Sequence, residues 1–475
     1  MEQPNAFGPS RRRFLRNAGM GGGVLALGPL AASLASEANA APAPMATSGK
    51  YDFDTPFNRI GSGCLKWDGS LRDEQMGHIV AGMGISDMDF QCGPFITAAL
   101  KKRIQFENWG YVDMASPGPM AFIESIIDWN KRRHGITAIT PDNIAFTMGV
   151  HAGLMDALRA FSPKGGKVLM LAPAYGGFYE DIVASRMVAN ESPMNYVNGQ
   201  YEIDWDDLER RMTPDTKVTI LCNPHNPVGR VWSKAELTRY GELCLKHKIV
   251  VLSDEIHCDF VNKGQKYTPF STLDDKKVVN NSITFTAASK SFSLGSLNLA
   301  WYFTTNKEMS AEVLSYDRNR TDIPSLSIAA AQGAQDNGEE WLNQLTAYID
   351  GNHDFVGEYV KANIPMIKVG AKPQGTFLRW LDVSEVARKI DAQKMADAEN
   401  GKPQTYDTQT GKTHIVSPEE MVGHWFARNA FVALNPGSIY GLGGAGHMRM
   451  NIATSRRTIK AALDSMAAAT RKISS

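Results

Sequence analysis

The sequence predicts an α/β protein whose larger domain is a mostly parallel sheet covered by helices on both faces. Three apolar runs, at 168–171, 249–252 and 283–286, have the length and composition of buried strands. Helical patterns alternate with such runs between about residues 96 and 337, as is typical of parallel sheets. Because a chain of this length needs more than one core, residues 338–475 are expected to form a smaller α/β domain, with residues 51–95 folding back onto it.

The first forty residues predict an export signal. The run Ser10-Arg11-Arg12-Arg13-Phe14-Leu15-Arg16 closely resembles the twin-arginine motif. A weakly apolar, Gly/Ala-rich stretch follows at 18–34, and Ala38-Asn39-Ala40 is a small-residue cleavage pattern. A basic tail would not need these ordered regions, and the apolar stretch is short and glycine-rich for a membrane span. We expect export by the twin-arginine machinery, cleavage near Ala40 and a periplasmic protein, with residues 41–50 as an Ala/Pro/Ser-rich linker.

Composition excludes some classes of function. Removal of residues 1–40 takes away four arginines and two glutamates and leaves 46 basic and 48 acidic residues. The mature chain therefore has no excess of basic residues that would indicate nucleic-acid binding. Its five cysteines are scattered without disulfide or metal spacing, so we expect free thiols and no metal site.

Two segments predict a pyridoxal-phosphate site. Lys290 lies in Thr286-Ala287-Ala288-Ser289-Lys290-Ser291-Phe292, thirty-six residues after the Asp254 of Ser253-Asp254-Glu255-Ile256-His257. Pyridoxal phosphate needs a lysine amine that forms a Schiff base with its aldehyde, and a carboxylate that keeps its pyridine nitrogen protonated. An isolated lysine is usually a solvated surface charge, so the prediction depends on the segments that accompany these two.

Three further segments lie where a parallel sheet would bring them together. Residues 144–161 pass from a short strand through Gly149 into a helix ending near Phe161, whose first N–H groups could bind a phosphate. Tyr175 follows a buried strand and could stack on a planar ring, although a core tyrosine is the alternative. The Asn223–Gly229 turn follows another strand.

Near the C-terminus, Arg449 lies in an otherwise apolar strand. Burial of a guanidinium is costly unless it is paired, so a partner is expected. A substrate carboxylate held by two parallel hydrogen bonds is such a partner.

Together these segments resemble fold-type I pyridoxal-phosphate enzymes of the aminotransferase class I and II superfamily, and within it the cystathionine beta-lyase-like branch typified by MalY and PatB. The resemblance covers about residues 57–468 and includes five ordered motifs, at 86–90, 173–175, 223–227, 253–257 and 289–292. It implies the aminotransferase fold, with a seven-stranded type of large sheet. Binding of a dinucleotide by the same sheet is a weaker prediction than binding of pyridoxal phosphate, because Gly441-Leu442-Gly443-Gly444 does not open a convincing β-α-β unit.

The resemblance also implies roles for individual residues. Lys290 would form the Schiff base and move the substrate proton, and Arg449 would bind the substrate's α-carboxylate. The implied cofactor-binding set is Gly149, Val150, His151, Tyr175, Asn226, Asp254, His257, Ser289 and Lys290, together with Tyr111, which would reach the phosphate of a partner subunit. That last role implies a homodimer.

The sequence departs from the superfamily at two phosphate-binding positions and in one long segment. Ala287 stands three residues before the lysine where a serine is frequent, and Asn298 stands eight residues after it where many aminotransferases have an arginine. We expect less positive charge around the phosphate. The stretch 387–418 is expected to be a surface insertion.

The reaction stays open between transamination and β-elimination, since both begin with loss of the α-proton. The family branch favours a carbon–sulfur β-lyase acting on cystathionine or another cysteine conjugate. Export favours an aminotransferase acting on an amino acid or on part of a secreted peptide, for example in siderophore tailoring, and transamination is the preferred prediction. A regulatory, protein-binding role is a third alternative.

Overall fold

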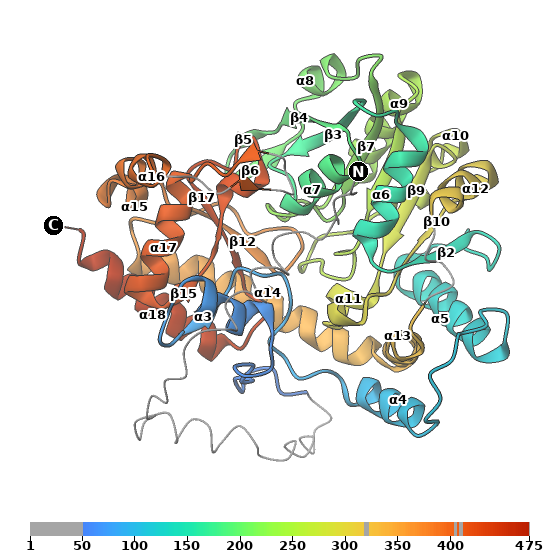
Figure 1. Ribbon diagram of the computed structural model, residues 1–475, viewed down its shortest axis with the longest axis horizontal. Coiled ribbons are helices and arrows are strands. Elements are labelled where there is room, and N and C mark those ends of the chain that lie inside the picture. The colour runs from blue at the N-terminus through green and yellow to red at the C-terminus, as the bar shows by residue number, and fades with distance from the viewer. Residues whose placement is uncertain (1–50, 318–322, 403–405, 408–411, 475) are drawn as a thin grey trace, which may run out of the picture.

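The computed structural model describes residues 51–474 except 318–322, 403–405 and 408–411. The predicted signal peptide and linker therefore lie outside the described residues. Figure 1 shows a larger body built on a central sheet and a smaller one beside it. Within the described ranges, no helix combines the length and the apolar character that crossing a membrane requires.

The large sheet has seven strands in the order β2-β10-β9-β8-β7-β3-β4. Strand β10 runs antiparallel to both of its neighbours, and the other ladders are parallel. This confirms the predicted mostly parallel sheet. The strands are β2 (Ile144–Thr147), β3 (Lys167–Ala172), β4 (Val188–Pro193), β7 (Thr216–Cys222), β8 (Val250–Asp254), β9 (Ser282–Thr286) and β10 (Ala300–Phe303).

Helices cover both faces because successive side chains of each strand point to opposite sides. On β3, Val168 and Met170 pack beneath α6 and α7, whereas Leu169 and Leu171 pack with α8 and α9. The helices of this domain are α4 (Pro94–Ile104), α5 (Pro117–His134), α6 (Val150–Phe161), α7 (Gly176–Ala184), α8 (Trp205–Arg210), α9 (Lys234–Lys246), α10 (Lys276–Val279), α11 (Ala288–Ser291), α12 (Lys307–Tyr316) and α13 (Ser325–Asn337), with the short 3-10 turns η3 (Phe270–Thr272) and η4 (Gly295–Leu297). A hairpin, β5 (Asn195–Val197) and β6 (Gln200–Glu202), projects from the sheet's edge after β4.

The smaller domain contains an antiparallel sheet of four strands in the order β11-β12-β17-β16. These are β11 (Lys368–Val369), β12 (Leu378–Asp382), β17 (His447–Asn451) and β16 (Asn435–Pro436). A parallel pair, β1 (Ala81–Gly82) with β15 (Val432–Ala433), joins the N-terminal segment to this domain. The other elements here are η2 (Leu65–Gly69), α3 (Ser70–Asp73), α14 (Glu339–Asn363), α15 (Ser384–Lys389), α16 (Ala392–Asn400), β13 (Tyr406–Asp407), β14 (Lys412–Thr413), α17 (Pro418–Ala430), η5 (Gly437–Tyr440) and α18 (Arg456–Arg471).

Two segments connect the cores of the two domains. In the N-terminal segment, Trp67 and Met83 belong to the small-domain core, while Phe53 and Phe90 pack with α4 and the start of α14. Helix α14 likewise contributes to both cores along its length. The expected insertion at 387–418 is not confined to the surface, because Ala392 and Ala396 of α16 are buried in the small-domain core, although parts of the segment lie outside the described residues.

Candidate cofactor and substrate site

The topology of the large sheet brings the predicted site residues to one edge. Strands β3, β7, β8 and β9 run parallel, so their carboxyl ends lie together, where ligands bind in open α/β sheets. Tyr175 follows the end of β3, Asn226 the end of β7 and Lys290 the end of β9, and Asp254 is the last residue of β8. Strand β2 runs in the same direction, which carries Gly149 and the start of α6 to this edge.

Lys290 and Asp254 interact electrostatically within this edge. The Lys290 Nζ donates a hydrogen bond to the Ser86 carbonyl at 2.8 Å. Loss of water around the amine, together with the positive charge of Arg449, lowers the pKa of Lys290 to about 8. Burial raises the pKa of Asp254 to about 6. The hydrogen bond from the Ile256 N–H to its Oδ1, at 3.1 Å, and the positive charges of His151 and Lys290 lower the pKa, but they do not outweigh burial.

Arg449 is buried, as its place in an apolar strand predicted. Its Nη1 donates to Asn226 Oδ1 at 3.2 Å and its Nη2 to the Gly84 carbonyl at 2.7 Å. Its Nε is buried without a hydrogen-bond partner, and the guanidinium carbon lies 5.2 Å from the ring centre of Tyr440. The guanidinium therefore has neutral oxygen partners at Nη1 and Nη2, and its Nε–H has none.

Asp254 and Arg449 are both buried at this edge, and neither has a counter-ion within 4.0 Å among the residues that the structure describes. The carboxylate of Asp254 matches the protonated nitrogen of a pyridinium ring, and the guanidinium of Arg449 matches a substrate carboxylate. The residues present thus fit pyridoxal phosphate with an amino-acid substrate.

The start of α6 has two features suited to a phosphate. Gly149 has a φ of 137°, which a residue with a side chain rarely adopts, and it leads the first N–H groups of the helix into the site. His151 Nδ1 lies 2.6 Å from Asp181 Oδ2. Burial disfavours protonation of His151, but the Asp181 carboxylate outweighs it and raises the pKa of the imidazole. The imidazole of His151 therefore carries positive charge more readily than a free imidazole, whereas Asn298, which is exposed after η4, has none to offer.

Other predicted residues differ in their surroundings. Tyr175 is half-buried, with its Oη 3.4 Å from His151 Nε2. His257 is buried with an unpartnered Nδ1, and burial holds its pKa well below the ordinary value, so the ring is neutral. Ser289 is half-buried in α11 beside Lys290. Tyr111 is 96% exposed and is not brought to the site of its own chain.

The backbone carbonyls that hold the two cations could not be predicted from side-chain patterns. Gly84 accepts from Arg449 and Ser86 accepts from Lys290. Their segment is fixed by the buried carboxylate of Asp89, which binds Lys66 Nζ at 2.8 Å. The run Ser86–Phe90 was the only signal in the sequence, because a carbonyl has no side chain by which to recognise its role.

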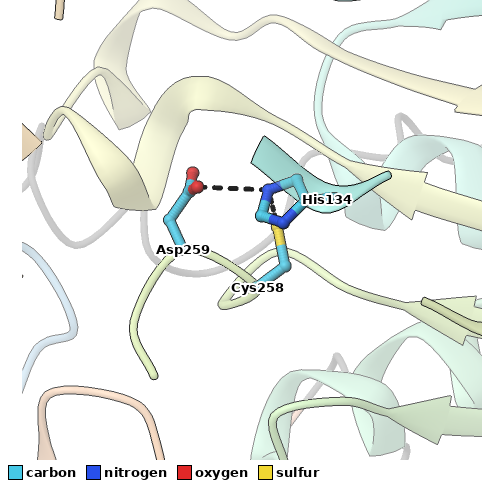
Figure 2. A group of neighbouring side chains, drawn as sticks. All are labelled: His134, Cys258 and Asp259. Atoms are coloured by element: carbon cyan, nitrogen blue, oxygen red, sulfur yellow. Dashed lines mark hydrogen bonds and ion pairs between the residues drawn. The ribbon is translucent and has the colours of Figure 1, made fainter. Parts of the chain in front are cut away.

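A cluster of His134, Cys258 and Asp259 holds α11, the short helix that carries Lys290, through a hydrogen bond to Ser291. Figure 2 shows His134 between Cys258 and Asp259, with its Nε2 3.2 Å from Asp259 Oδ1 and 3.6 Å from Cys258 Sγ. Asp259 also binds Arg133 Nε at 2.6 Å and accepts from the Ser291 hydroxyl at 2.5 Å. The three ligand-type atoms lie within 4.8 Å of one another. Because Asp259 already has these partners and burial raises the pKa of the Cys258 thiol, hydrogen bonding accounts for the cluster better than a metal.

Comparison with known proteins agrees with this geometry. The chain is 33% identical over 422 residues to cystathionine beta-lyase PatB of Bacillus subtilis, covering 88% of this chain and 99% of that protein. A pyridoxal-phosphate-bound structure of an aminotransferase described as putative, from Clostridium difficile, is 29% identical with a TM-score of 0.77, covering 88% of this chain and 100% of the other. The pyridoxal-phosphate-bound C-S lyase of Staphylococcus hominis is 26% identical with a TM-score of 0.74, covering 88% and 98%.

These structures have pyridoxal phosphate in common, and the similarity extends over both domains. The model of the family "Aminotransferase class I and II" matches residues 79–466, and this range includes every predicted site residue. The chain therefore belongs to the aminotransferase class I and II family and is a pyridoxal-phosphate-dependent enzyme of fold type I.

Proposed function

We propose that the protein is a carbon–sulfur β-lyase that cleaves cystathionine or another cysteine S-conjugate. The observation that carries this proposal is the 33% identity to cystathionine beta-lyase PatB over nearly the whole of both chains. Transamination is the preferred prediction from the sequence. The comparisons support the lyase better, because PatB and the Staphylococcus hominis protein are both named for carbon–sulfur cleavage.

The reaction starts with positioning of the substrate and removal of its α-proton. Arg449 binds the α-carboxylate, using the donor that has no partner in the protein. The pKa of the Lys290 amine is lowered to about 8, so the amine loses its proton far more readily than an ordinary lysine, and it accepts the proton from Cα. When bound, pyridoxal phosphate supplies the electron sink that stabilises the negative charge at that carbon.

Elimination then breaks the bond between Cβ and sulfur. The sulfur leaves with the bonding electron pair and takes up a proton, which Lys290 can return. Addition of water to the remaining three-carbon part gives pyruvate and ammonia, so each molecule of cystathionine and water yields homocysteine, pyruvate and ammonia. Asp254 would hold the ring nitrogen, Tyr175 would stack on the ring, and the α6 start with His151 would hold the phosphate.

Incubation of the holoenzyme with L-cystathionine tests the proposal. We expect equal amounts of pyruvate, ammonia and homocysteine, with no need for a 2-oxo acid. Arg449→Lys keeps the charge but not the paired donors, and it should raise KM about tenfold or more. Absence of pyruvate with several cysteine conjugates would overturn the lyase assignment.

Transamination is the second candidate, favoured by the likeness to the Clostridium difficile protein described as a putative aminotransferase. In that case an amino acid alone would convert the bound cofactor to its amine form without releasing ammonia. A 2-oxo acid would then restore the original absorbance and yield a new amino acid. The two reactions are thus separated by their products in one experiment.

A further inference from the structure

A cavity of about 360 Å³ lies apart from the residues assigned to the cofactor. It is formed where the β5–β6 hairpin of the large domain, the turn after β7 and the edge of the small sheet meet. The Trp380 Nε1–H donates to the Tyr201 hydroxyl across this junction at 3.1 Å. Figure 1 shows β5 and β6 in the region where the two domains adjoin.

Arg379 of β12 lines this cavity and is only 3% exposed. Its Nε is buried without a partner, and no hydrogen bond or ion pair of its guanidinium is found among residues 51–474 as far as they are described. The carboxylate of Asp354, which is close enough to favour its charge, is paired with Lys372 Nζ at 2.8 Å. Burial lowers the pKa of Arg379 to about 10, so the side chain stays charged at neutral pH.

The other charges around the cavity leave Arg379 as its unsatisfied centre. Four basic side chains line it, Arg230, Lys368, Lys372 and Arg379, against one acidic side chain, Asp382. Arg230 is paired with Glu236, and Lys372 with two aspartates. Lys368 is exposed, so its charge is solvated. Trp380, whose ring stacks on His447 at 5.1 Å between centroids, lines the part of the cavity on the opposite face of the small sheet.

The backbone of α14 leaves room for the guanidinium. A Cβ at Gly357 would lie 3.3 Å from Arg379 Nη2, closer than nearly all such contacts. A buried guanidinium without a counter-ion is costly, and an apolar residue of similar volume would stabilise the site more. This cost is offset when a ligand supplies the missing negative charge.

We propose that this cavity is a binding site for a carboxylate, with Arg379 as its anchor. One unpaired buried guanidinium matches one carboxylate group, which it can hold by two parallel hydrogen bonds. The site is distinct from that of Arg449. Trp380 is directly opposite Arg449 on β17, so Arg379, its neighbour on β12, projects from the other face of the small sheet.

The carboxylate can come from a separate small acid or from the far end of the substrate. The cavity shares elements with the catalytic site, since His447 lies two residues before Arg449 and Val228 two residues after Asn226. The second source rests on the proposed lyase function, whereas binding of a separate acid does not.

Calorimetric titration of the holoenzyme with succinate tests the site directly, with uncharged succinamide as the blank. Arg379→Met keeps the volume and removes the charge, and it should weaken succinate binding about tenfold or more. The matched control Arg388→Met removes an exposed arginine of α15 and should leave the affinity within about twofold. Because succinate can also reach Arg449, the visible absorbance of the cofactor is followed to detect that occupancy.

Two further measurements separate binding from a purely structural role. Arg379→Met should melt at the same or a higher temperature than the wild type, and succinate should raise the melting temperature of the wild type but not of the variant. Gly357→Ala, which keeps the arginine but crowds its Nη2, should also weaken succinate binding. Equal succinate affinity in the wild type and Arg379→Met would overturn the proposal.

The kinetics distinguish the two sources. If the carboxylate belongs to the substrate, Arg379→Met raises KM for L-cystathionine about tenfold but leaves S-methyl-L-cysteine unchanged, because only the first has a distal carboxylate. If it belongs to a separate acid, both KM values stay unchanged while succinate binding is lost. A loss of kcat with both substrates and intact succinate binding means a structural role and contradicts the proposal.

Discussion

In its proposed role at the cofactor's ring nitrogen, Asp254 is a residue at which stability is sacrificed for cofactor binding. Its carboxylate is 4% exposed and has one hydrogen bond, from the Ile256 N–H, among the described residues. Burial raises its pKa from 3.8 to about 6. The folded apoprotein therefore binds a proton more tightly than the unfolded chain, and this contribution to stability is complete below about pH 4 and lost as the pH rises through 6.

We expect Asp254→Asn to stabilise the cofactor-free protein at pH 8, by about 2 to 3 kcal/mol, because the amide needs no charge and can still accept from Ile256. Urea unfolding of the apoprotein at pH 8 and pH 4 measures this, and the difference should shrink towards zero at pH 4. The same variant should retain pyridoxal phosphate more weakly. A wild-type apoprotein more stable than the variant at pH 8 would contradict the assignment.

Lys290 gives the most direct prediction for activity. In its proposed role, Lys290 is both the proton acceptor and the amine that binds the cofactor, so Lys290→Ala should lower pyruvate formation about 10²- to 10⁴-fold. The visible absorbance of the bound cofactor should change at the same time. Lys361→Ala, at an exposed position of α14, serves as the control and should leave both unchanged. An unaltered cofactor spectrum in Lys290→Ala would remove the lysine assignment.

At the scale of elements, the junction of β2 and α6 follows directly from the sequence. The predicted short strand and the helix ending near Phe161 are both confirmed. Glycine is favoured between them because the backbone there has a φ of 137°, which other residues rarely adopt. A β-carbon at this position would have no neighbouring atom within 4 Å. The requirement at this position is therefore conformational and not one of space.

We predict that Gly149→Ala weakens cofactor binding as well as stability, since backbone strain of about 1 to 3 kcal/mol would displace the first N–H groups of α6. Gly165→Ala is the matched control. Gly165 also has a positive φ, of 80°, and open space around its Cα, but it lies in the turn before β3. Equilibrium dialysis with pyridoxal phosphate should separate the two variants, and equal retention in both would remove the special role of α6.

Local sequence predicted the elements better than the contacts between distant segments. Buried strands such as β3 and β8 were recognisable because parallel strands are apolar on both faces. The Lys290–Ser86 and Arg449–Gly84 bonds join positions more than two hundred residues apart through backbone oxygens. Such oxygens are present at every residue, so no pattern of side chains marks them. The buried charge of Arg379 was missed for a related reason, because only the fold places it at a cavity.

At the scale of the molecule, the exposed segment after α4 indicates a self-association surface. Phe106 is 74% exposed, Trp109 56% and Tyr111 96%, and a cluster of this kind typically marks an interaction site. We propose a two-fold homodimer in which Tyr111 reaches the partner's cofactor. Light scattering should give a dimer, and Tyr111→Phe should weaken cofactor retention without changing the mass.

Mixing two impaired variants, at a cofactor concentration that leaves Tyr111→Phe largely unloaded, sharpens this prediction. In a heterodimer of Lys290→Ala and Tyr111→Phe chains, one site has both residues intact and the other has neither, so activity should reappear after subunit exchange. A monomer in solution, or no recovery although heterodimers form, would contradict the shared site.

Export is the prediction that concerns the whole chain, and it connects the location of the enzyme to its cofactor. We propose that the twin-arginine pathway carries the protein already folded, because a membrane is a high barrier to a charged phosphorylated cofactor, which is therefore best bound beforehand. Replacing Arg11 and Arg12 by lysine should leave a full-length, cofactor-loaded protein in the cytoplasm, whereas the wild type should appear in the periplasm with its N-terminus near Ala41. Fractionation with N-terminal sequencing measures both, with Arg16→Lys as the control that should still be exported. Periplasmic recovery of the double variant, or an intact cytoplasmic N-terminus in the wild type, would rule out this route.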